Sequence, residues 1–283
     1  MDTDIQTTEK LPTHRQIVLL VILTAVTSVI AALAHTAILL FSYDPSLGVY
    51  AYGEAGPVIF IAGTVIGLIA VAIAAFSVPS GTCGLVEMPL CGTAEAFFAA
   101  MTGAAMFAYS VMNAITVRIP SSGQTAASDG NAELILWTVM AALSIPSAAY
   151  LIISAVTKAG SAKKLTVLGF FPVLWTAVCL LRIYFDRTSA INNPVKLYSQ
   201  MALAAIMLYF LSELRIRVGK PVLRMYAAFA GISAMLGFSY SVSVIAASLA
   251  GVDDLSGELL LAVIILLSSL YGFSRIAAMR NRF

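Results

Sequence analysis

Polar residues that could bind a small ligand gather in one stretch of an otherwise apolar chain. Arg182 and Asp186 are four residues apart, which places both side chains on one face of a helix. Pro194 can begin the next helix, whose first backbone N–H groups could then meet an anion. The same stretch holds four further polar residues: Asn192, Asn193, Lys196 and Gln200. We therefore expect a site for an anionic group, although a simple Arg182–Asp186 pair at the membrane surface explains that pair without a ligand.

Three more side chains are candidates for ligand contact, because polar groups are costly inside a membrane. His35 is the only histidine within an apolar segment. Tyr109 and Tyr240 occupy matching places in two other segments, and each is followed by a serine. A buried phenol needs a hydrogen-bond partner or a place at the membrane interface. Packing is the simpler interpretation for all three, and contact with a ligand is the alternative.

The sequence lacks the motifs that several kinds of catalysis require. Zinc chemistry needs three ligands around one ion, but the only histidines are His14 and His35, and there is no HExxH motif. The chain has no GxSxG motif for a serine nucleophile and no P-loop for nucleotide hydrolysis. We therefore expect no enzymatic activity, no metal and no cofactor.

The cysteines offer one weak alternative to this expectation. Cys83 and Cys91 flank a loop that contains Glu87, which is one ligand short of a structural zinc site. We place this loop in the reducing cytoplasm, where a disulfide is disfavoured. An idle pair of thiols is the simpler interpretation, and a functional pair is the alternative. The third cysteine is Cys179.

The composition places the chain in a membrane. Hydrophobic residues make up 60% of the chain and charged residues only 11%, whereas a soluble domain has about 25% charged residues. The mean hydropathy is +0.94. This apolar composition makes the lipid bilayer the expected environment. A net charge of +2 leaves no basic surface for binding nucleic acid.

Eight apolar runs are long enough for helices that cross a bilayer, which takes about 20 residues each. They cover residues 17–42, 55–78, 94–117, 132–157, 165–185, 195–214, 222–250 and 258–279. Membrane-spanning strands would be shorter and alternating, so the chain is predicted to be an all-α polytopic membrane protein. Gly63 and Gly67 form a GxxxG stripe, which predicts close packing of the second helix.

The distribution of Lys and Arg predicts the orientation of these helices. With residues 1–16 in the cytoplasm, 12 of the 16 cations fall on the cytoplasmic side, so both termini are expected there. Glu213 and Arg217, four residues apart, belong to this basic rim, which we interpret as the usual cytoplasmic excess of positive charge. A cleaved signal peptide in place of the first helix is the alternative interpretation of residues 10–34.

An internal duplication is suggested by two matching segments. Residues 96–111 and 227–242 align with seven identical positions of sixteen, including Tyr109 opposite Tyr240. We therefore expect two parallel four-helix repeats, residues 17–157 and 165–283, joined by a basic cytoplasmic linker at 158–164. Parallel repeats occur in carriers, although duplication is also a simple way to build any large bundle.

The segment 171–224 resembles a group of uncharacterised multi-pass membrane proteins of Gram-positive bacteria. The likeness covers about a fifth of the chain. It is a general similarity in the pattern of residues and includes no catalytic motif. It lies in these residues: Arg182, Asp186, Asn193, Pro194, Lys196, Gln200, Glu213 and Arg215. The resemblance implies a bacterial plasma membrane and implies no activity.

Two functions remain open on these grounds. The first is a transporter-like or small-ligand-binding membrane protein, whose polar mouth lies at the outer ends of the fifth and sixth helices. The second is a non-catalytic accessory or sensor subunit that acts through a partner membrane protein. The sequence favours the second only through the lack of an evident charged pair at mid-depth.

Overall fold

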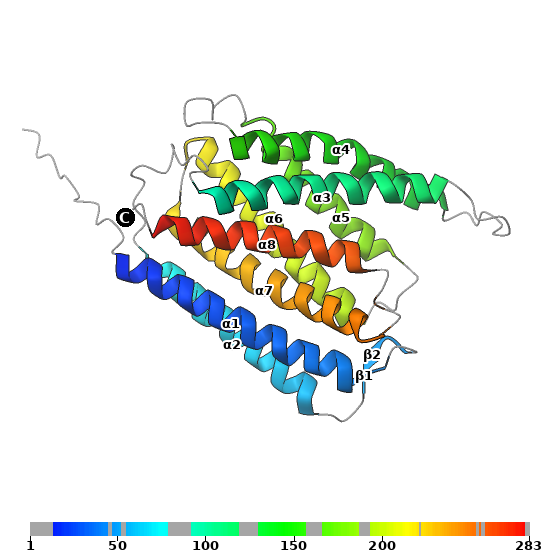
Figure 1. The fold of residues 1–283 in the computed structure, drawn as a ribbon, viewed down its shortest axis with the longest axis horizontal. Coiled ribbons are helices and arrows are strands. Elements are labelled where there is room, and N and C mark those ends of the chain that lie inside the picture. The colour runs from blue at the N-terminus through cyan, green and yellow to red at the C-terminus, as the bar shows by residue number, and fades with distance from the viewer. Residues whose placement is uncertain are drawn as a thin grey trace, which may run out of the picture.

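The computed structural model is an all-helical bundle, as the sequence predicts (Figure 1). It describes residues 14–44, 47–51, 55–78, 92–118, 130–156, 166–186, 193–220, 222–252, 255 and 258–280. The helices are α1 (His14–Phe41), α2 (Ala55–Phe76), α3 (Thr93–Arg118), α4 (Gly130–Val156), α5 (Phe170–Phe185), α6 (Pro194–Arg217), α7 (Leu223–Leu249) and α8 (Leu259–Met279). Between α1 and α2, β1 (Tyr43–Asp44) and β2 (Val49–Tyr50) pair as a short antiparallel hairpin.

Each of the eight apolar runs overlaps one of these helices, but α5 is shorter than the others. Seven helices of the described chain are long and apolar enough to cross a membrane. Helix α5 has 16 residues, which rise about 24 Å, less than the roughly 30 Å of a hydrocarbon core. A turn over residues 166–169 precedes it, with Gly169 N–H donating to the Thr166 carbonyl at 3.1 Å. Because the other seven helices have the length and composition of membrane spans, the chain is a multi-pass membrane protein.

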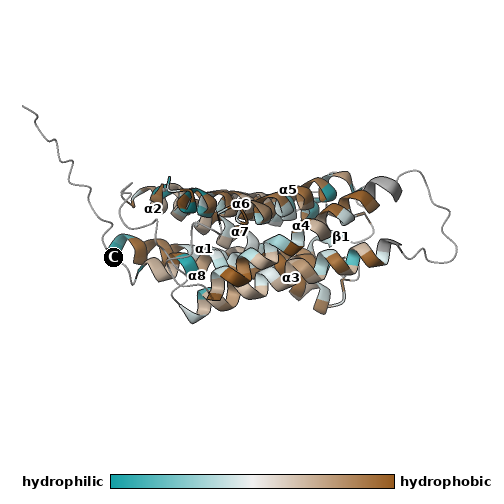
Figure 2. Cartoon of the chain, turned by 90° about the horizontal axis from the view of Figure 1, so that it is seen from above, coloured by the Kyte–Doolittle hydropathy of each residue, from teal (hydrophilic) through white to brown (hydrophobic). Residues whose placement is uncertain are grey.

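The helices form two layers around α7. Figure 2 shows α1, α8 and α3 in one layer, and α2, α6 and α5 in the other. Helix α7 contacts α1, α2, α6 and α8, while the α3–α4 pair packs against α8 and α5. The first four helices therefore do not pack as a unit of their own, and the duplication remains a prediction.

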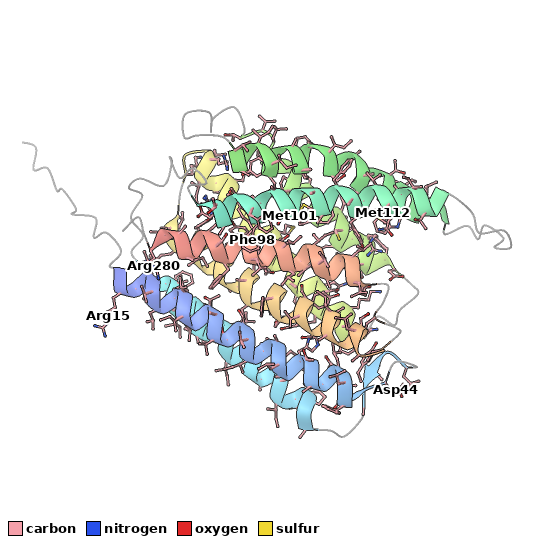
Figure 3. The ribbon with its side chains drawn as sticks, viewed as in Figure 1. Arg15, Asp44, Phe98, Met101, Met112 and Arg280 are labelled. Carbon is pink, nitrogen blue, oxygen red and sulfur yellow. The ribbon has the colours of Figure 1, made fainter. Side chains whose placement is uncertain are left out.

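The two ends of the bundle differ in charge. Arg15 and Arg280 lie at one end and Asp44 at the other (Figure 3). We call these the basic end, where α1 begins and α8 ends, and the hairpin end, where β1 and β2 lie. On the flank of α3, Met101 and Met112 are exposed, as expected for a surface that faces lipid.

Glycines on the helices separate close contacts from open surface. A Cβ at Gly103 of α3 would lie 3.1 Å from both the Cα and the carbonyl oxygen of Ala148 on α4. In the GxxxG stripe, Gly67 packs closely against Met235 of α7, but Gly63 has nothing within 4 Å. Only half of the stripe therefore serves helix packing within this chain.

We expect Gly103→Val to lower the Tm of the purified protein by several degrees, because the added side chain forces α3 and α4 apart. Overpacking of this kind costs about 1–3 kcal/mol. Thermal unfolding in detergent measures the effect. Gly63→Val is the matched control and should leave the Tm nearly unchanged; an equal loss in both variants would contradict the packing described.

Candidate functional site

Arg182 is the centre of a polar cluster at the hairpin end. Its Nη2 donates a hydrogen bond to the Tyr109 hydroxyl at 3.1 Å, and its guanidinium lies 4.5 Å from the centre of the Trp137 ring. The Nε–H is buried and has no hydrogen-bond partner among the described residues. The arginine is thus fixed by aromatic neighbours and keeps one donor available.

Lys196 and Asn193 are held by backbone contacts at the junction of α5 and α6. The Lys196 Nζ donates to the backbone carbonyl of Asp186, the C-cap residue that follows α5. The Asn193 Oδ1 accepts from the backbone N–H groups of Val195 at 2.9 Å and of Lys196 at 3.2 Å. The first N–H groups of α6, which the sequence offers to an anion, are therefore capped by the protein itself.

Glu258 adds an acid to this cluster that the sequence analysis did not select. It lies just before α8, accepts a weak hydrogen bond from the Tyr240 hydroxyl at 3.5 Å and interacts electrostatically with Arg182 and Lys196. Burial raises the pKa of the Glu258 carboxyl, and the positive charge of Arg182 opposes that shift. The sequence signal that could have identified Glu258 is an acidic residue at the start of an apolar run.

The structure thus brings five of the predicted residues together with Glu258. We call this group the hairpin-end cluster, and it has these members: Tyr109, Arg182, Asp186, Lys196, Tyr240 and Glu258. It carries two cations and two acids, so its formal charges balance. Gln200 is half-buried farther along α6, and Asn192 lies outside the described residues.

His35 lies beside this cluster in an aromatic environment. Its ring stacks on Phe60 at 4.9 Å and meets the edge of Tyr198 at 4.7 Å between ring centres. Its Nε2 is 3.3 Å from the hydroxyl of Tyr50, so it also joins the hairpin to α1. Tyr198 in turn lies 6.1 Å from Tyr240. His35 is thus packed among aromatic rings, and its contact with a ligand stays a prediction.

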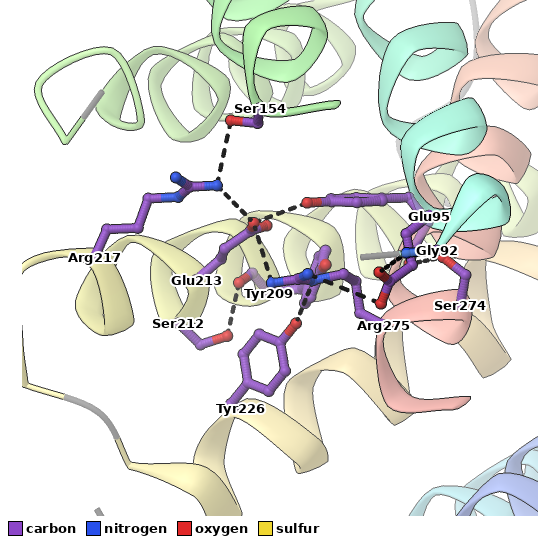
Figure 4. Close-up of polar contacts among 11 residues, drawn as sticks. Gly92, Glu95, Ser154, Tyr209, Ser212, Glu213, Arg217, Tyr226, Ser274 and Arg275 are labelled. Atoms are coloured by element: carbon purple, nitrogen blue, oxygen red, sulfur yellow. Dashed lines mark hydrogen bonds and ion pairs between the residues drawn. The ribbon is translucent and has the colours of Figure 1, made fainter. Parts of the chain in front are cut away.

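A second cluster, at the basic end, is centred on Arg275 of α8 (Figure 4). Arg275 is only 4% exposed, and its Nε donates to the Tyr226 hydroxyl at 3.2 Å. Its guanidinium nitrogens lie 3.9 Å from Glu95 Oε1 and 4.0 Å from Glu213 Oε1. One arginine therefore ties the beginnings of α3 and α7 to the end of α6.

Glu213 extends this network to α4. It accepts a hydrogen bond from Tyr271 at 2.8 Å, and its Oε1 lies 3.6 Å from the Arg217 Nη2. The same Nη2 donates to Ser154 of α4 at 3.2 Å (Figure 4). The basic-end cluster has these members: Glu95, Ser154, Glu213, Arg217, Tyr226, Tyr271 and Arg275. It also balances two cations against two acids.

These contacts correct the interpretation of Glu213 and Arg217 as part of a plain basic rim. Their side chains are 2% and 12% exposed, so the pair is buried among helices. Glu95 was not singled out in the sequence, and Arg275 was counted only as a cytoplasmic charge. The missed signal was position: Glu95, Glu213 and Arg275 each lie about one turn inside a helix end.

Several atoms of the basic-end cluster lack a direct hydrogen bond. Within the described ranges these include Glu213 Oε2, Arg217 Nε and Arg275 Nη1, and Tyr209 Oη next to them is likewise unpartnered. The separations of Arg275 from the two acids exceed hydrogen-bond length. Bridging water molecules would satisfy such groups. The network thus combines tight burial with incomplete pairing.

No group of three or more His, Cys, Asp or Glu side chains suited to a metal ion occurs in the part of the chain that the structure describes. Cys83 and Cys91 lie outside that part, so the prediction about their loop stays open. Cys179 is a buried free thiol on α5, one turn before Arg182.

Comparisons of the chain with family models, with curated proteins and with solved structures found no match. The clusters themselves therefore carry the functional argument.

We expect Arg275→Met to lower the free energy of unfolding by about 3–5 kcal/mol, because it leaves two buried acids without their shared cation. Chemical or thermal unfolding in detergent measures this loss. Adding Glu213→Gln to that variant should restore part of the stability. The control is Arg280→Met at the same end, where the side chain is exposed and little change is expected. Equal effects at positions 275 and 280 would contradict the buried network.

Glu258→Gln should gain stability relative to the wild type as the pH rises from about 4.5 to about 7. Because burial raises the pKa of Glu258 in the folded state, the folded chain binds this proton more tightly than the unfolded chain. The wild type therefore loses stability over this interval, and a glutamine does not. Tm measured against pH for both proteins gives the difference; a difference independent of pH would refute the assignment.

Proposed function

We propose that this protein is a transporter-like protein of a bacterial plasma membrane, which moves a small polar solute through the body formed by α3 to α8. The observation that carries the proposal is a pair of charge-balanced clusters at opposite ends of the same helices, one enclosed among helices at the basic end and one partly exposed at the hairpin end. Helices α3, α4, α6, α7 and α8 contribute to both clusters or to their immediate contacts, and α5 adds Arg182.

Stability alone gives little reason for these clusters. Ionisable groups inside a membrane are costly, and they commonly mark pathways for ions or solutes. A buried ion pair adds little net stability, because desolvation offsets its attraction, yet removing one partner is strongly destabilising. Such pairs suit a gate, since two arrangements with comparable pairing can have similar free energies.

The clusters have the composition expected of two gates. Arg275 joins α8 to α3 and α6 at the basic end, while at the hairpin end Arg182 of α5 interacts electrostatically with Glu258, which precedes α8. A solute path between them would open to one side when one cluster separates. The positive-inside distribution supports a cytoplasmic basic end, with the hairpin end outside and both termini in the cytoplasm.

An accessory or sensor subunit is the second candidate, and one observation favours it. A mostly apolar groove of about 190 Å³ opens between α1, α7 and α8, with Ala25, Ala234, Phe238 and Phe273 among its lining residues. One or two side chains from a helix of a partner membrane protein could fill this groove. Purification with a defined partner, without the gating behaviour below, would favour this alternative.

The proposal predicts that Cys179 becomes accessible when the hairpin-end cluster opens. Cys179 is fully buried next to Arg182. In a Cys83→Ser/Cys91→Ser background it is the only thiol of the chain. A membrane-impermeant maleimide added to intact cells should label it several-fold faster after Arg182→Gln, which weakens the outer gate, and more slowly after Arg275→Gln, which weakens the inner one.

Arg280→Gln serves as the matched control, because this exposed arginine belongs to neither cluster. Its labelling rate should equal that of the background. A rate that is the same in all four proteins would show a rigid bundle and would reject the gated carrier.

A further inference from the structure

We propose that the hairpin-end cluster binds a zwitterion, a small molecule with one carboxylate and one ammonium group such as a free α-amino acid. The inference rests on the proposed function and specifies its solute class. It follows from the unpaired donor of Arg182, the loosely held acid Glu258 and the balance of charge around them.

The carboxylate of the ligand would bind Arg182. The buried Nε–H of this arginine has no partner in the described part of the chain, and a carboxylate can bind a guanidinium side-on through Nε and a terminal nitrogen. The Tyr109 hydroxyl accepts a hydrogen bond from Nη2, and the Trp137 ring lies 4.5 Å from Cζ, so two aromatic neighbours hold the guanidinium. Arg182 is therefore already oriented before a ligand arrives.

The ammonium group would bind Glu258. Among described residues, the only hydrogen bond given to this carboxylate comes from Tyr240 at 3.5 Å, the weak limit for such a bond. Glu258 and Arg182 interact electrostatically but do not form an ion pair within 4.0 Å in the described structure. The described structure thus holds two opposite charges in one cluster without a direct ion pair between them.

Charge balance selects a zwitterion over a simple ion. Among the described residues, the hairpin-end cluster holds Arg182 and Lys196 against Asp186 and Glu258, so these four side chains have no net formal charge. An anion bound at Arg182 would meet the repulsion of Glu258, and a cation at Glu258 would meet that of Arg182, in surroundings that screen charge poorly. A zwitterion satisfies both groups and leaves the buried charge at zero.

The ligand could reach this site from the hairpin end. Arg182 and Glu258 are both half-buried, whereas Glu213 and Arg275 of the basic-end cluster are almost fully enclosed. In that second cluster the arginines already have acids within 3.6 to 4.0 Å. The hairpin-end cluster is therefore the binding site, and the basic-end cluster closes the other side.

The test is a thermal-shift panel on the full-length protein in detergent at neutral pH, with each of the common free α-amino acids as probe. At about a hundredfold above Kd, a true ligand should raise the Tm by roughly 5 °C or more. The N-acetyl form of the best ligand, which lacks the cation, and its methyl ester, which lacks the anion, should give little shift. Absence of any shift, or equal shifts with either analogue, overturns the proposal.

Two charge-neutralising variants test the assignment of each group. Glu258→Gln should lose the response to the amino acid and gain one to the N-acetyl form, while Arg182→Gln should gain one to the methyl ester. Arg280→Gln should respond as the wild type does. A response to the amino acid that survives in both cluster variants places the ligand elsewhere and overturns the proposal.

The outcome is separable from that of the transport proposal. Cys179 labelling that responds to Arg182→Gln and Arg275→Gln, with no amino-acid response, rejects the zwitterion and leaves the gated carrier standing. Uniform labelling rejects the carrier itself.

Discussion

The cost of placing charge in a hydrocarbon environment governs the architecture of this protein. A side chain such as Arg275, only 4% exposed, is tolerated because acids on other helices face it. Since those acids belong to α3 and α6, the requirement to neutralise one arginine fixes how three helices meet. The same reasoning applies at the hairpin end, where Arg182 of α5 faces residues of α3, α4 and α8. Apolar packing holds the helices together, and the charged clusters determine which helices meet at each end of the bundle.

The two clusters differ in how completely they are closed. At the basic end, tyrosines and two arginines surround Glu213 within the helix body. At the hairpin end, Glu258 and Arg182 form no ion pair with each other within 4.0 Å in the described part of the chain, and both side chains are partly exposed. This asymmetry is what an outward-facing binding step and an inward-facing seal would require, and it gives the proposed solute a direction of entry.

The length of the apolar runs was sufficient to locate the helices, because each run is long and bounded by turn residues. It could not give the neighbours of α7, since lipid-facing and buried positions are equally apolar in a membrane. The grouping of Arg182 with Asp186 and Lys196 was predictable from spacing along the chain. Glu95 and Glu258 were missed because their partners lie on helices distant in sequence. Resolving those contacts needs the three-dimensional packing.

The central claim is that the two ends of the α3–α8 body open in opposition. Spin-label distance measurements in lipid nanodiscs test it most directly, with one pair at exposed Tyr184 and Leu249 for the hairpin end and another at exposed Val156 and Arg280 for the basic end. We expect two populations of distance for each spin-label pair. Conditions that lengthen the distance at one end should shorten the distance at the other end. A single narrow distance for both pairs under all conditions would contradict it.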